Sequence, residues 1–276
     1  MDVTTPTATP VASPADEFDT ARAMDDDRAL SVEIGRRDAG LPGAARAADY
    51  IAGEISKLGW RVEQRPFPLP QGGVSWNVVG TPPGFAETRP YLLVGGHYDT
   101  LRGPGANDNG TGIAAALEVV RALALRPAML PVAFVAFGAE EVQPVPGTGH
   151  HHIGSRYYVA HMSDAARGNL VAYVNLDMVG VGPVVLCMHT ATGPREGTLR
   201  CVRKGVEIGV PTKETVTPDW SDNGSFLRDG LNAAALWTGD QTCCNHTPRD
   251  TIDRVQPDAV SRAGRLALAI LRSYSG

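Results

Sequence analysis

Five residues of types that bind metal ions stand at the ends of apolar runs or in turn-forming segments. They are His97 in GGHYDT, Asp108 in GANDNGTG, Glu141 in AEEV, Asp177 in NLDMVG and His246 in CNHTPRD. Two imidazoles and three carboxylates form a ligand set that suits zinc, with manganese or cobalt as alternatives. Five ligands exceed what one tetrahedral ion with an open position needs. They suit two ions that share one bridging carboxylate.

Each of these residues, taken alone, has a simpler interpretation as a helix cap, a turn acid or a hydrogen-bonded core histidine. Asp108 stands in NDNG, for example, which would serve equally well as a turn and a helix start. The metal-site hypothesis rests on all five residues falling at the same kind of location.

The elements that must position these residues are four continuous apolar runs. Runs of this kind are typical of strands buried on both faces; here they are YLLVGGHYDT, LPVAFVAFGAEE, LVAYVNLDMVG and LNAAALWTGD. Helical patterns separate or follow them: NGTGIAAALEVVRALAL, GSRYYVAHM, GTLRCVRKGVEIG, NGSFLRDG and PDAVSRAGRLALAILRSY. The alternation predicts an α/β domain with a mostly parallel central sheet and helices on both faces. Ligands bind at the carboxyl ends of such strands, so we expect the reactive groups to converge on one rim.

The region before these runs has a different character. Residues 1–17 are rich in Thr, Pro and Ala, so we expect a disordered stalk there and one catalytic domain over residues 18–276. The pattern from about Phe18 to Gly59 is helical, WRVEQRPF alternates as an exposed strand, and VSWNVVGT is its expected neighbour. Stalks of this composition often follow a removed signal or lipid anchor, which suggests an exported protein, extracellular or in the cell envelope.

Composition excludes several classes of protein. The 276 residues are 43% hydrophobic, which is enough for one large core, and no apolar window is long enough to predict a transmembrane helix. A net charge of -5 with scattered Lys and Arg excludes a nucleic-acid footprint. The four cysteines, Cys187, Cys201, Cys243 and Cys244, lack the spacing of a structural zinc site and allow three disulfide pairings, one of them with a vicinal bridge.

A series of motifs, in order along the chain, resembles the co-catalytic di-zinc aminopeptidase family typified by bacterial leucyl aminopeptidases. The motifs are GGHYDT, GPGANDNGTGIAAALEVVRAL, VAFVAFGAEE, GSRYY, VNLDMVG, SDNGSFLRDGL and HTPRDTID, and the likeness runs from about Arg37 to the C-terminus. The resemblance implies a single domain with a mixed sheet of about eight strands. It also implies zinc as the cofactor, peptides as substrates and removal of N-terminal residues as the reaction.

Carried over position by position, the resemblance implies that Asp108 bridges two zinc ions. His97 and Asp177 would complete the ligands of one ion, and Glu141 and His246 those of the other. Asp99 matches an acid that bonds the imidazole N–H of a histidine ligand, which fixes its tautomer.

Glu140 matches the general acid/base of the family, which takes a proton from the attacking water and delivers it to the leaving amine. Neighbouring side chains of a regular strand point to opposite faces. If Glu140 and Glu141 serve one cavity, the chain must therefore leave strand geometry, and we predict a turn within FGAEE.

The sequence departs from the family pattern at two places. Asn245 stands where several members carry a tyrosine that stabilises the oxyanion, and an amide donor of shorter reach takes its place. An insert, VQPVPGTGHHHIGSR, brings His150, His151 and His152, which we interpret as a solvated loop that forms part of the pocket wall rather than as metal ligands.

Three further polar residues need an interpretation. His161 and His189 lie within apolar patterns and are expected to be structural. Asp222 in WSDNGSF matches a position that lines the pocket in relatives, and its alternative is a helix N-terminal acid.

These observations predict a zinc aminopeptidase that acts as a monomer. A one-zinc glutaminyl cyclase is the main alternative, because its relatives share the HYD, paired-acid and GSR motifs. Carboxypeptidases of related subfamilies usually carry an inserted domain that this chain is too short to hold. A non-catalytic binding domain is the alternative from another class, although such domains usually lose ligands or the base.

Overall fold

The computed structural model describes residues 17–141, 151–218, 220–239 and 244–275. The expected stalk lies outside these ranges except for Glu17. Glu17 is already held against the domain by ion pairs with Arg126 at 2.7 Å and Arg272 at 2.6 Å.

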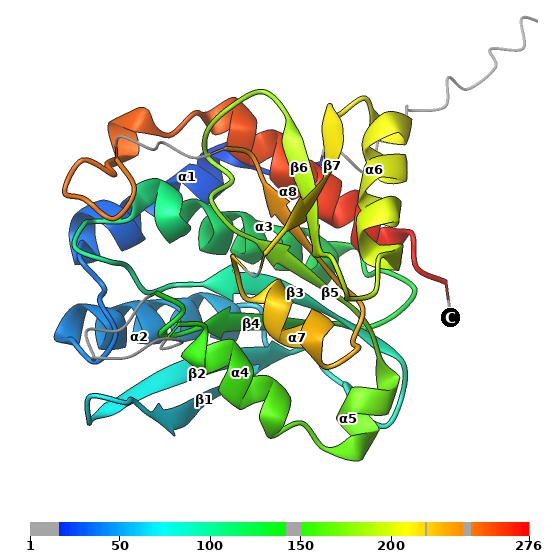
Figure 1. Ribbon diagram of the computed structural model, residues 1–276, viewed down its shortest axis with the longest axis horizontal. Coiled ribbons are helices and arrows are strands. Elements are labelled where there is room, and N and C mark those ends of the chain that lie inside the picture. The colour runs from blue at the N-terminus through cyan, green and yellow to red at the C-terminus, as the bar shows by residue number, and fades with distance from the viewer. Residues whose placement is uncertain (1–16, 142–150, 219, 240–243, 276) are drawn as a thin grey trace, which may run out of the picture.

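One mixed sheet of eight strands forms the centre of the described structure, in the order β1-β2-β4-β3-β5-β8-β6-β7 (Figure 1). The strands are β1 (Arg61–Pro68), β2 (Val74–Thr81), β3 (Tyr91–His97), β4 (Val132–Phe137), β5 (Leu170–Leu176), β6 (Val185–Thr190), β7 (Thr212–Thr217) and β8 (Ala233–Trp237). The central strands β4, β3, β5 and β8 pair in parallel, as do β6 and β7. The pairs β1–β2, β2–β4 and β6–β8 are antiparallel. The predicted mixed, mostly parallel sheet is confirmed.

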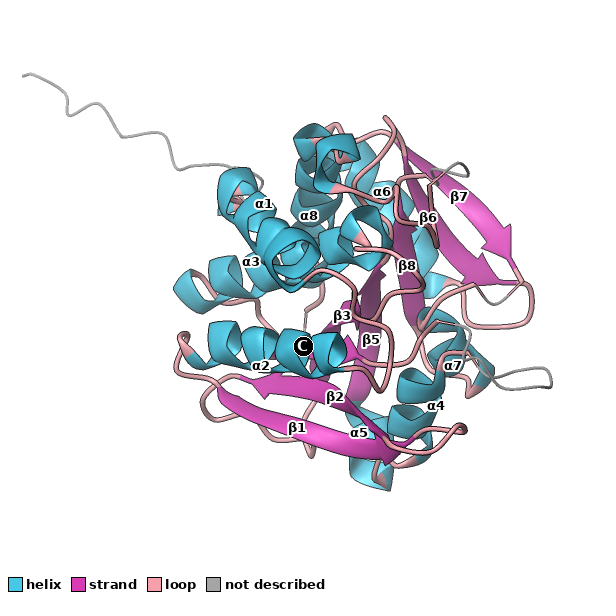
Figure 2. Ribbon diagram, turned by 90° about the vertical axis from the view of Figure 1, so that its left-hand side faces the viewer, coloured by secondary structure: helices cyan, strands magenta, loops and turns pink. Residues whose placement is uncertain are grey.

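Helices cover both faces of the sheet (Figure 2). They are α1 (Thr20–Arg28), α2 (Pro42–Ser56), α3 (Thr111–Leu125), α4 (Ile153–Ala160), α5 (Asp164–Asn169), α6 (Glu196–Ile208), α7 (Asn223–Arg228) and α8 (Pro257–Arg272), with short π segments η2 (Ala29–Ile34) and η3 (Ala106–Gly110) and a 3-10 turn η4 (Ile252–Arg254). Strands β6 and β7 and helix α5 were not among the expected elements.

Strand β4 shows how the sheet separates two cores. Its residues Val132, Phe134 and Ala136 pack in the core that contains α1, α2, α3, α6 and α8. The alternate residues Ala133, Val135 and Phe137 pack with α4 and α7 on the other face. Because both faces are buried, the strand is apolar throughout, as its sequence indicated.

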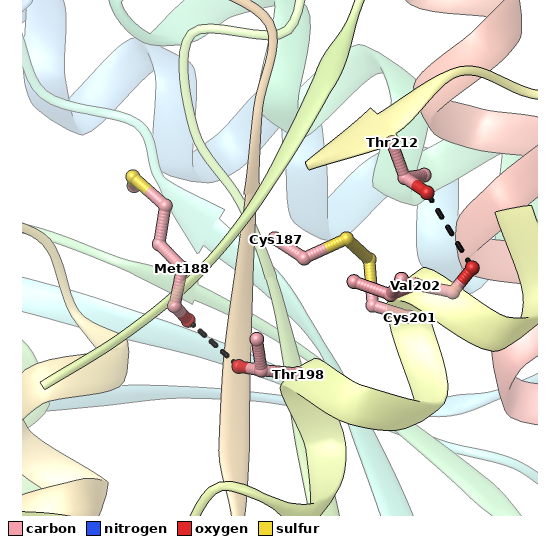
Figure 3. The surroundings of a disulfide bond; sticks show 6 residues. All are labelled: Cys187, Met188, Thr198, Cys201, Val202 and Thr212. Atoms are coloured by element: carbon pink, nitrogen blue, oxygen red, sulfur yellow. Dashed lines mark hydrogen bonds between the residues drawn. A yellow bond between two sulfur atoms is a disulfide. The ribbon is translucent and has the colours of Figure 1, made fainter. Parts of the chain in front are cut away.

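A disulfide bond joins Cys187 of β6 to Cys201 of α6 (Figure 3). Both cysteines are fully buried, and Thr198 of α6 also donates a hydrogen bond to the backbone oxygen of Met188. A disulfide that closes a loop of this length, with cysteines 14 residues apart, stabilises a fold by about 3 kcal/mol. The pairing that would form a vicinal bridge involves Cys243, which lies outside the described residues.

No helix in the described part of the chain has the length and apolar character needed to cross a membrane.

Candidate active site

The candidate metal ligands meet at the carboxyl ends of the central strands. His97 is the last residue of β3, Asp177 directly follows β5, and Glu141 follows the end of β4. Asp108 lies in η3, and His246 lies in the segment that follows β8. The rim that the apolar runs predicted therefore brings together residues from five separate segments of the chain.

Asp108 lies between two histidines. Its Oδ1 is 3.4 Å from His97 Nε2, and its Oδ2 is 3.1 Å from His246 Nε2. Glu141 Oε2 is also 3.1 Å from His246 Nε2, and Asp177 Oδ1 is 3.5 Å from His97 Nε2. The two oxygens of the Asp108 carboxylate thus face two different histidines. His97 also lies near Asp177, and His246 also lies near Glu141.

Two groups of side chains are compact enough to hold an ion among the described residues. One contains His97, Glu140 and Asp177, and the other contains Asp108, Glu141 and His246. In each group the ligand atoms lie within 4.8 Å of one another. Imidazole nitrogens and carboxylate oxygens in this number suit zinc.

The charge balance of the site also fits metal ions. Asp108, Glu140, Glu141 and Asp177 are each less than 10% exposed, and no Lys or Arg is among the described residues that line their cavity. Four carboxylates therefore meet in one cavity whose other titratable groups, among the described residues, are the imidazoles of His97, His151, His152 and His246. Buried like charges are unfavourable unless cations lie between them, and divalent ions would supply that charge.

The pKa values reflect the same crowding. Burial raises the pKa of the Glu140 and Glu141 carboxyls well above the ordinary value, and neighbouring carboxylates add to the rise. Burial also acts to raise the pKa of Asp108, but hydrogen bonds from His246 and His97 outweigh it and lower the value. Hydrogen bonds to Asp108 and Glu141 raise the pKa of His246 to about 10. The charged form of Asp108 is therefore favoured, in contrast to those of Glu140 and Glu141.

The predicted turn within FGAEE is confirmed. Strand β4 ends at Phe137, and Ala139 takes a left-handed conformation with φ of 55°. A Cβ on Gly138 would lie 2.4 Å from Ser75 Oγ, so the close approach of the chain there requires glycine. The turn lets Glu140 and Glu141 line the same cavity.

Asp99 holds this turn from the side of β3. Its Oδ1 accepts the backbone N–H of Glu140 at 2.9 Å, and its Oδ2 accepts that of Glu141 at 3.2 Å. Its distance to the imidazole is longer, with 3.5 Å between Oδ1 and His97 Nδ1. The hydrogen-bond partner of His97 Nδ1 is instead the Asp99 backbone oxygen at 3.3 Å, and the carboxylate holds two backbone N–H groups that the sequence did not indicate.

Two further buried charges hold the Asp108 segment and were not singled out from the sequence. Asp250 accepts the backbone N–H groups of Asn107 at 2.8 Å and Asp108 at 2.9 Å. Arg37 is fully buried and donates to the carbonyl oxygens of Pro104 at 2.7 Å and Gly105 at 2.8 Å. Asp250 stands in the HTPRD motif close after His246, which is the signal that could have identified it.

A cavity of about 340 Å³ adjoins both ligand groups. Besides the acids and histidines, its wall contains Met178, Met188, Trp220 and Trp237. The two indole rings meet edge to face with centroids 5.8 Å apart, and Trp220 is 55% exposed at the surface. The cavity wall thus combines ionic groups with apolar and aromatic side chains.

The structure corrects the interpretation of the histidine insert. His150 lies outside the described residues, but His151 and His152 line the cavity, as expected for a pocket wall. His152 is only 2% exposed, so it does not belong to a solvated loop, and its Nε2 lies 2.7 Å from Glu140 Oε1. His161 and His189 contact Tyr157 and Glu214 instead and are not among the cavity-lining residues.

The two expected substrate-binding residues differ in position. Asn245 lines the cavity, and its amide nitrogen lies 3.5 Å from Met178 Sδ. Asp222 lies behind the wall instead of on it, because its carboxylate is fully buried at the start of α7 and only its neighbours Ser221 and Trp220 reach the cavity. In this structure Asp222 is therefore not placed to contact a ligand in the cavity.

Fold and site together define an α/β domain with a candidate metal centre at the carboxyl rim of its sheet. The model of Peptidase family M28 matches residues 77–271, and the chain belongs to that family. Leupeptin-inactivating enzyme 1 of Streptomyces exfoliatus is 30% identical over 210 residues, which cover 74% of this chain and 45% of that protein. The chain spans less than half the length of the curated relatives that it matches.

Solved structures share the fold. BSAP, a zinc aminopeptidase from Bacillus subtilis, superimposes with a TM-score of 0.83 at 19% identity, covering 92% of this chain and 94% of that chain. A glutaminyl cyclase from Tannerella forsythia superimposes with a TM-score of 0.78 at 20% identity, covering 94% and 99%. The same architecture therefore occurs in an aminopeptidase and in a cyclase, so fold alone does not choose between the two activities.

Proposed function

We propose that this protein is an aminopeptidase that uses two zinc ions to remove N-terminal residues from peptides. The observation that carries the proposal is the position of Asp108, whose two carboxylate oxygens face two separate histidines. A single carboxylate placed in this way suits a bridge between two ions. The peptidase family and the zinc aminopeptidase among the structural neighbours support the same conclusion.

In this proposal each ion has its own terminal ligands besides Asp108. His97 and Asp177 would hold one ion, and Glu141 and His246 would hold the other. Zinc, when bound, polarises a carbonyl group and makes water more acidic. The described residues of one chain supply all five ligands, which agrees with a monomeric enzyme.

Glu140 is the proposed general base. It takes a proton from the attacking water and passes it to the leaving amine as the peptide bond breaks. Its Oε2 is 3.9 Å from His97 Nε2, close to the ligand group without sharing the shorter contacts of Asp108.

The cavity wall supports an apolar N-terminal residue as the preferred substrate. Met178, Met188, Trp220 and Trp237 add apolar surface to the cavity that the acids and histidines line, and burial of an apolar side chain against them is favourable. Asn245, beside His246, is the proposed amide donor to the developing oxyanion.

The decisive experiment measures zinc content and turnover on the same zinc-loaded full-length chain. A panel of leucyl, phenylalanyl, glutamyl and lysyl anilides is assayed before chelation, after chelation and after zinc is restored. We expect two zinc ions per chain, activity highest on the apolar substrates, and reversible loss on chelation. Two bound ions without turnover on any substrate would instead support a binding domain.

The same preparation distinguishes the aminopeptidase from the alternative, a one-zinc glutaminyl cyclase. A peptide with N-terminal glutamine is incubated with the zinc-loaded chain, and the product is identified by its mass. Loss of ammonia with one zinc ion per chain would replace the aminopeptidase proposal, whereas release of free glutamine agrees with it.

We also infer that the protein works in an oxidising compartment. The Cys187–Cys201 disulfide supports this, because such bonds persist mainly outside the cytosol. Mass measurement of the native protein under conditions that block free thiols tests it, and free Cys187 and Cys201 would contradict it.

A further inference from the structure

His152 is tied to the Glu140 turn by its backbone. Its N–H donates to the Glu140 carbonyl oxygen at 2.7 Å, and the next residue, Ile153, donates to Ala139 at 2.8 Å. His152 itself takes a left-handed conformation with φ of 54° directly before α4. These two backbone hydrogen bonds hold the main chain of His152 against the Glu140 turn, with the imidazole beside the Glu140 side chain.

The imidazole contacts one particular oxygen of the carboxylate. His152 Nε2 lies 2.7 Å from Glu140 Oε1, whereas Oε2 is the oxygen closer to His97. On its other side, His152 Nδ1 lies 3.1 Å from His151 Nδ1. If Nε2 carries the hydrogen that is donated to the carboxylate, a neutral His152 accepts at Nδ1 and His151 is the donor. The two rings, which meet edge to face, therefore form a short chain of hydrogen bonds that ends on Glu140.

A carboxylate in this place needs such a restraint. Terminal rotation of a glutamate carboxylate is only weakly restricted by its own torsion. One Glu140 oxygen already lies within 4.8 Å of ligand atoms of His97 and Asp177, so rotation or a small shift could add Glu140 to that ligand group. A base that binds the ion directly would lose the freedom to take up a proton.

We propose that His152 is a positioning residue that holds Oε1 of Glu140 and thereby keeps this carboxylate a base rather than a metal ligand. The inference rests on the proposed aminopeptidase function. Asp99 fixes the backbone of Glu140 from the β3 side, and His152 fixes its side chain from the α4 side. Correct orientation of a catalytic group is worth a large factor in rate, and a hydrogen bond to a charged group supplies part of it.

The test compares two substitutions at one position. His152→Asn suits the left-handed backbone, which asparagine tolerates well, but its amide ends where the histidine Nδ1 lies and does not reach Glu140. His152→Gln is longer and can place an amide N–H near the former Nε2. His161→Asn is the matched control, because His161 is exposed at the end of the same helix.

Turnover is measured per folded, zinc-loaded chain of full length, so that a loss of stability does not count as a loss of rate. We expect His152→Asn to lower kcat by about 10- to 100-fold with KM changed less than about twofold. His152→Gln should recover most of the rate, and His161→Asn should match the wild type. Crystal structures of the zinc-loaded variants should show Glu140 turned toward His97 and Asp177 in His152→Asn only.

Several outcomes would overturn the inference. An unchanged kcat in His152→Asn would do so, as would equal loss in the Asn and Gln variants with Glu140 unmoved. Loss of a zinc ion in both variants would make His152 a ligand instead. A wild-type chain that is zinc-loaded but inactive would remove the proposed function and this inference with it, whereas an active wild type with an unaffected His152→Asn removes the inference alone.

Discussion

The backbone N–H of Glu140 donates to Asp99 Oδ1 at 2.9 Å, so an acid just after β3 sets the direction of the chain that leaves β4. The same carboxylate receives the N–H of Glu141, and it is completely buried. One side chain therefore positions the proposed base and a proposed ligand together.

Replacement of Asp99 by asparagine should disturb both residues, because an amide has only one oxygen to accept two N–H groups. We expect zinc affinity and kcat each to fall by about 10- to 100-fold. Competition with a fluorescent chelator and steady-state kinetics measure the two effects. Asp229→Asn, at an exposed ion pair with Arg167, is the control. Wild-type zinc affinity in Asp99→Asn would contradict the assigned role.

Substitution of each adjacent acid by glutamine should distinguish the role of Glu140 from that of Glu141. Glu140→Gln should retain two zinc ions and lose about 100- to 10,000-fold in kcat, because the amide cannot take up a proton. Glu141→Gln should lose one zinc ion, because a neutral amide is a poorer ligand than a carboxylate. Metal analysis of both variants after the same dialysis decides the roles. Zinc loss confined to Glu140→Gln would exchange them.

Arg37 should matter for stability far more than its neighbour in sequence. Its guanidinium donates to five backbone carbonyls, including those of Leu30, Tyr98 and Gly105, and is fully buried. Arg37→Met removes the guanidinium donor from all five oxygens, of which those of Leu30 and Gly105 keep a backbone N–H, and should lower the free energy of unfolding by about 3 to 5 kcal/mol. Arg36→Met removes an exposed pair with Asp38 and should cost less than about 1 kcal/mol. Urea unfolding followed by circular dichroism measures both, and similar losses would refute the distinction.

Asp222 should make stability depend on pH. Burial, with a smaller contribution from the Glu140 charge, raises the pKa of Asp222 to about 7. The folded state therefore keeps a proton that the unfolded chain releases near pH 4, and stability from this group is lost as the pH rises from about 4 to about 7.

Asp222→Asn should remove this loss and stabilise the protein at pH 8 by about 1 to 4 kcal/mol, with little change near pH 4. Urea unfolding at several pH values measures the difference, and Asp164→Asn at the exposed start of α5 is the control. KM should stay near the wild-type value, because Asp222 lies behind the cavity wall. A large rise in KM without a change in stability would restore the substrate-binding interpretation.

The sequence predicted the central sheet and the convergence of the five candidate ligands because both depend on local patterns. Each apolar run that ends in His97 or Asp177 indicates both a buried strand and the position of its carboxyl end, and only a few neighbouring residues are needed to recognise it. Strand β7 was not predicted in this way. Its sequence, TKETVT, lies at the edge of the sheet and is mostly accessible, so it contains few apolar residues that would indicate a buried strand.

Contacts between distant segments could not be predicted in the same way. The position of His152 depends on backbone bonds to Ala139 and Glu140 across an insert, and consecutive histidines in a loop give no sign of it. The buried contacts of Arg37 and the choice of Cys201 as the partner of Cys187 likewise follow from packing rather than from spacing.

The placement of Asp250 has a consequence for how the site opens. His246 and Asp250 are four residues apart, and Asp250 holds the backbone of Asn107 and Asp108 from the far end of the chain. The segment that carries one ligand thus also clamps the loop that carries another. Separation of residues 244–250 from the domain would release the amide hydrogens of Asn107 and Asp108 to solvent at the same moment. The two loops therefore form one cooperative opening unit, and hydrogen exchange at both amides should proceed with a shared free energy of opening.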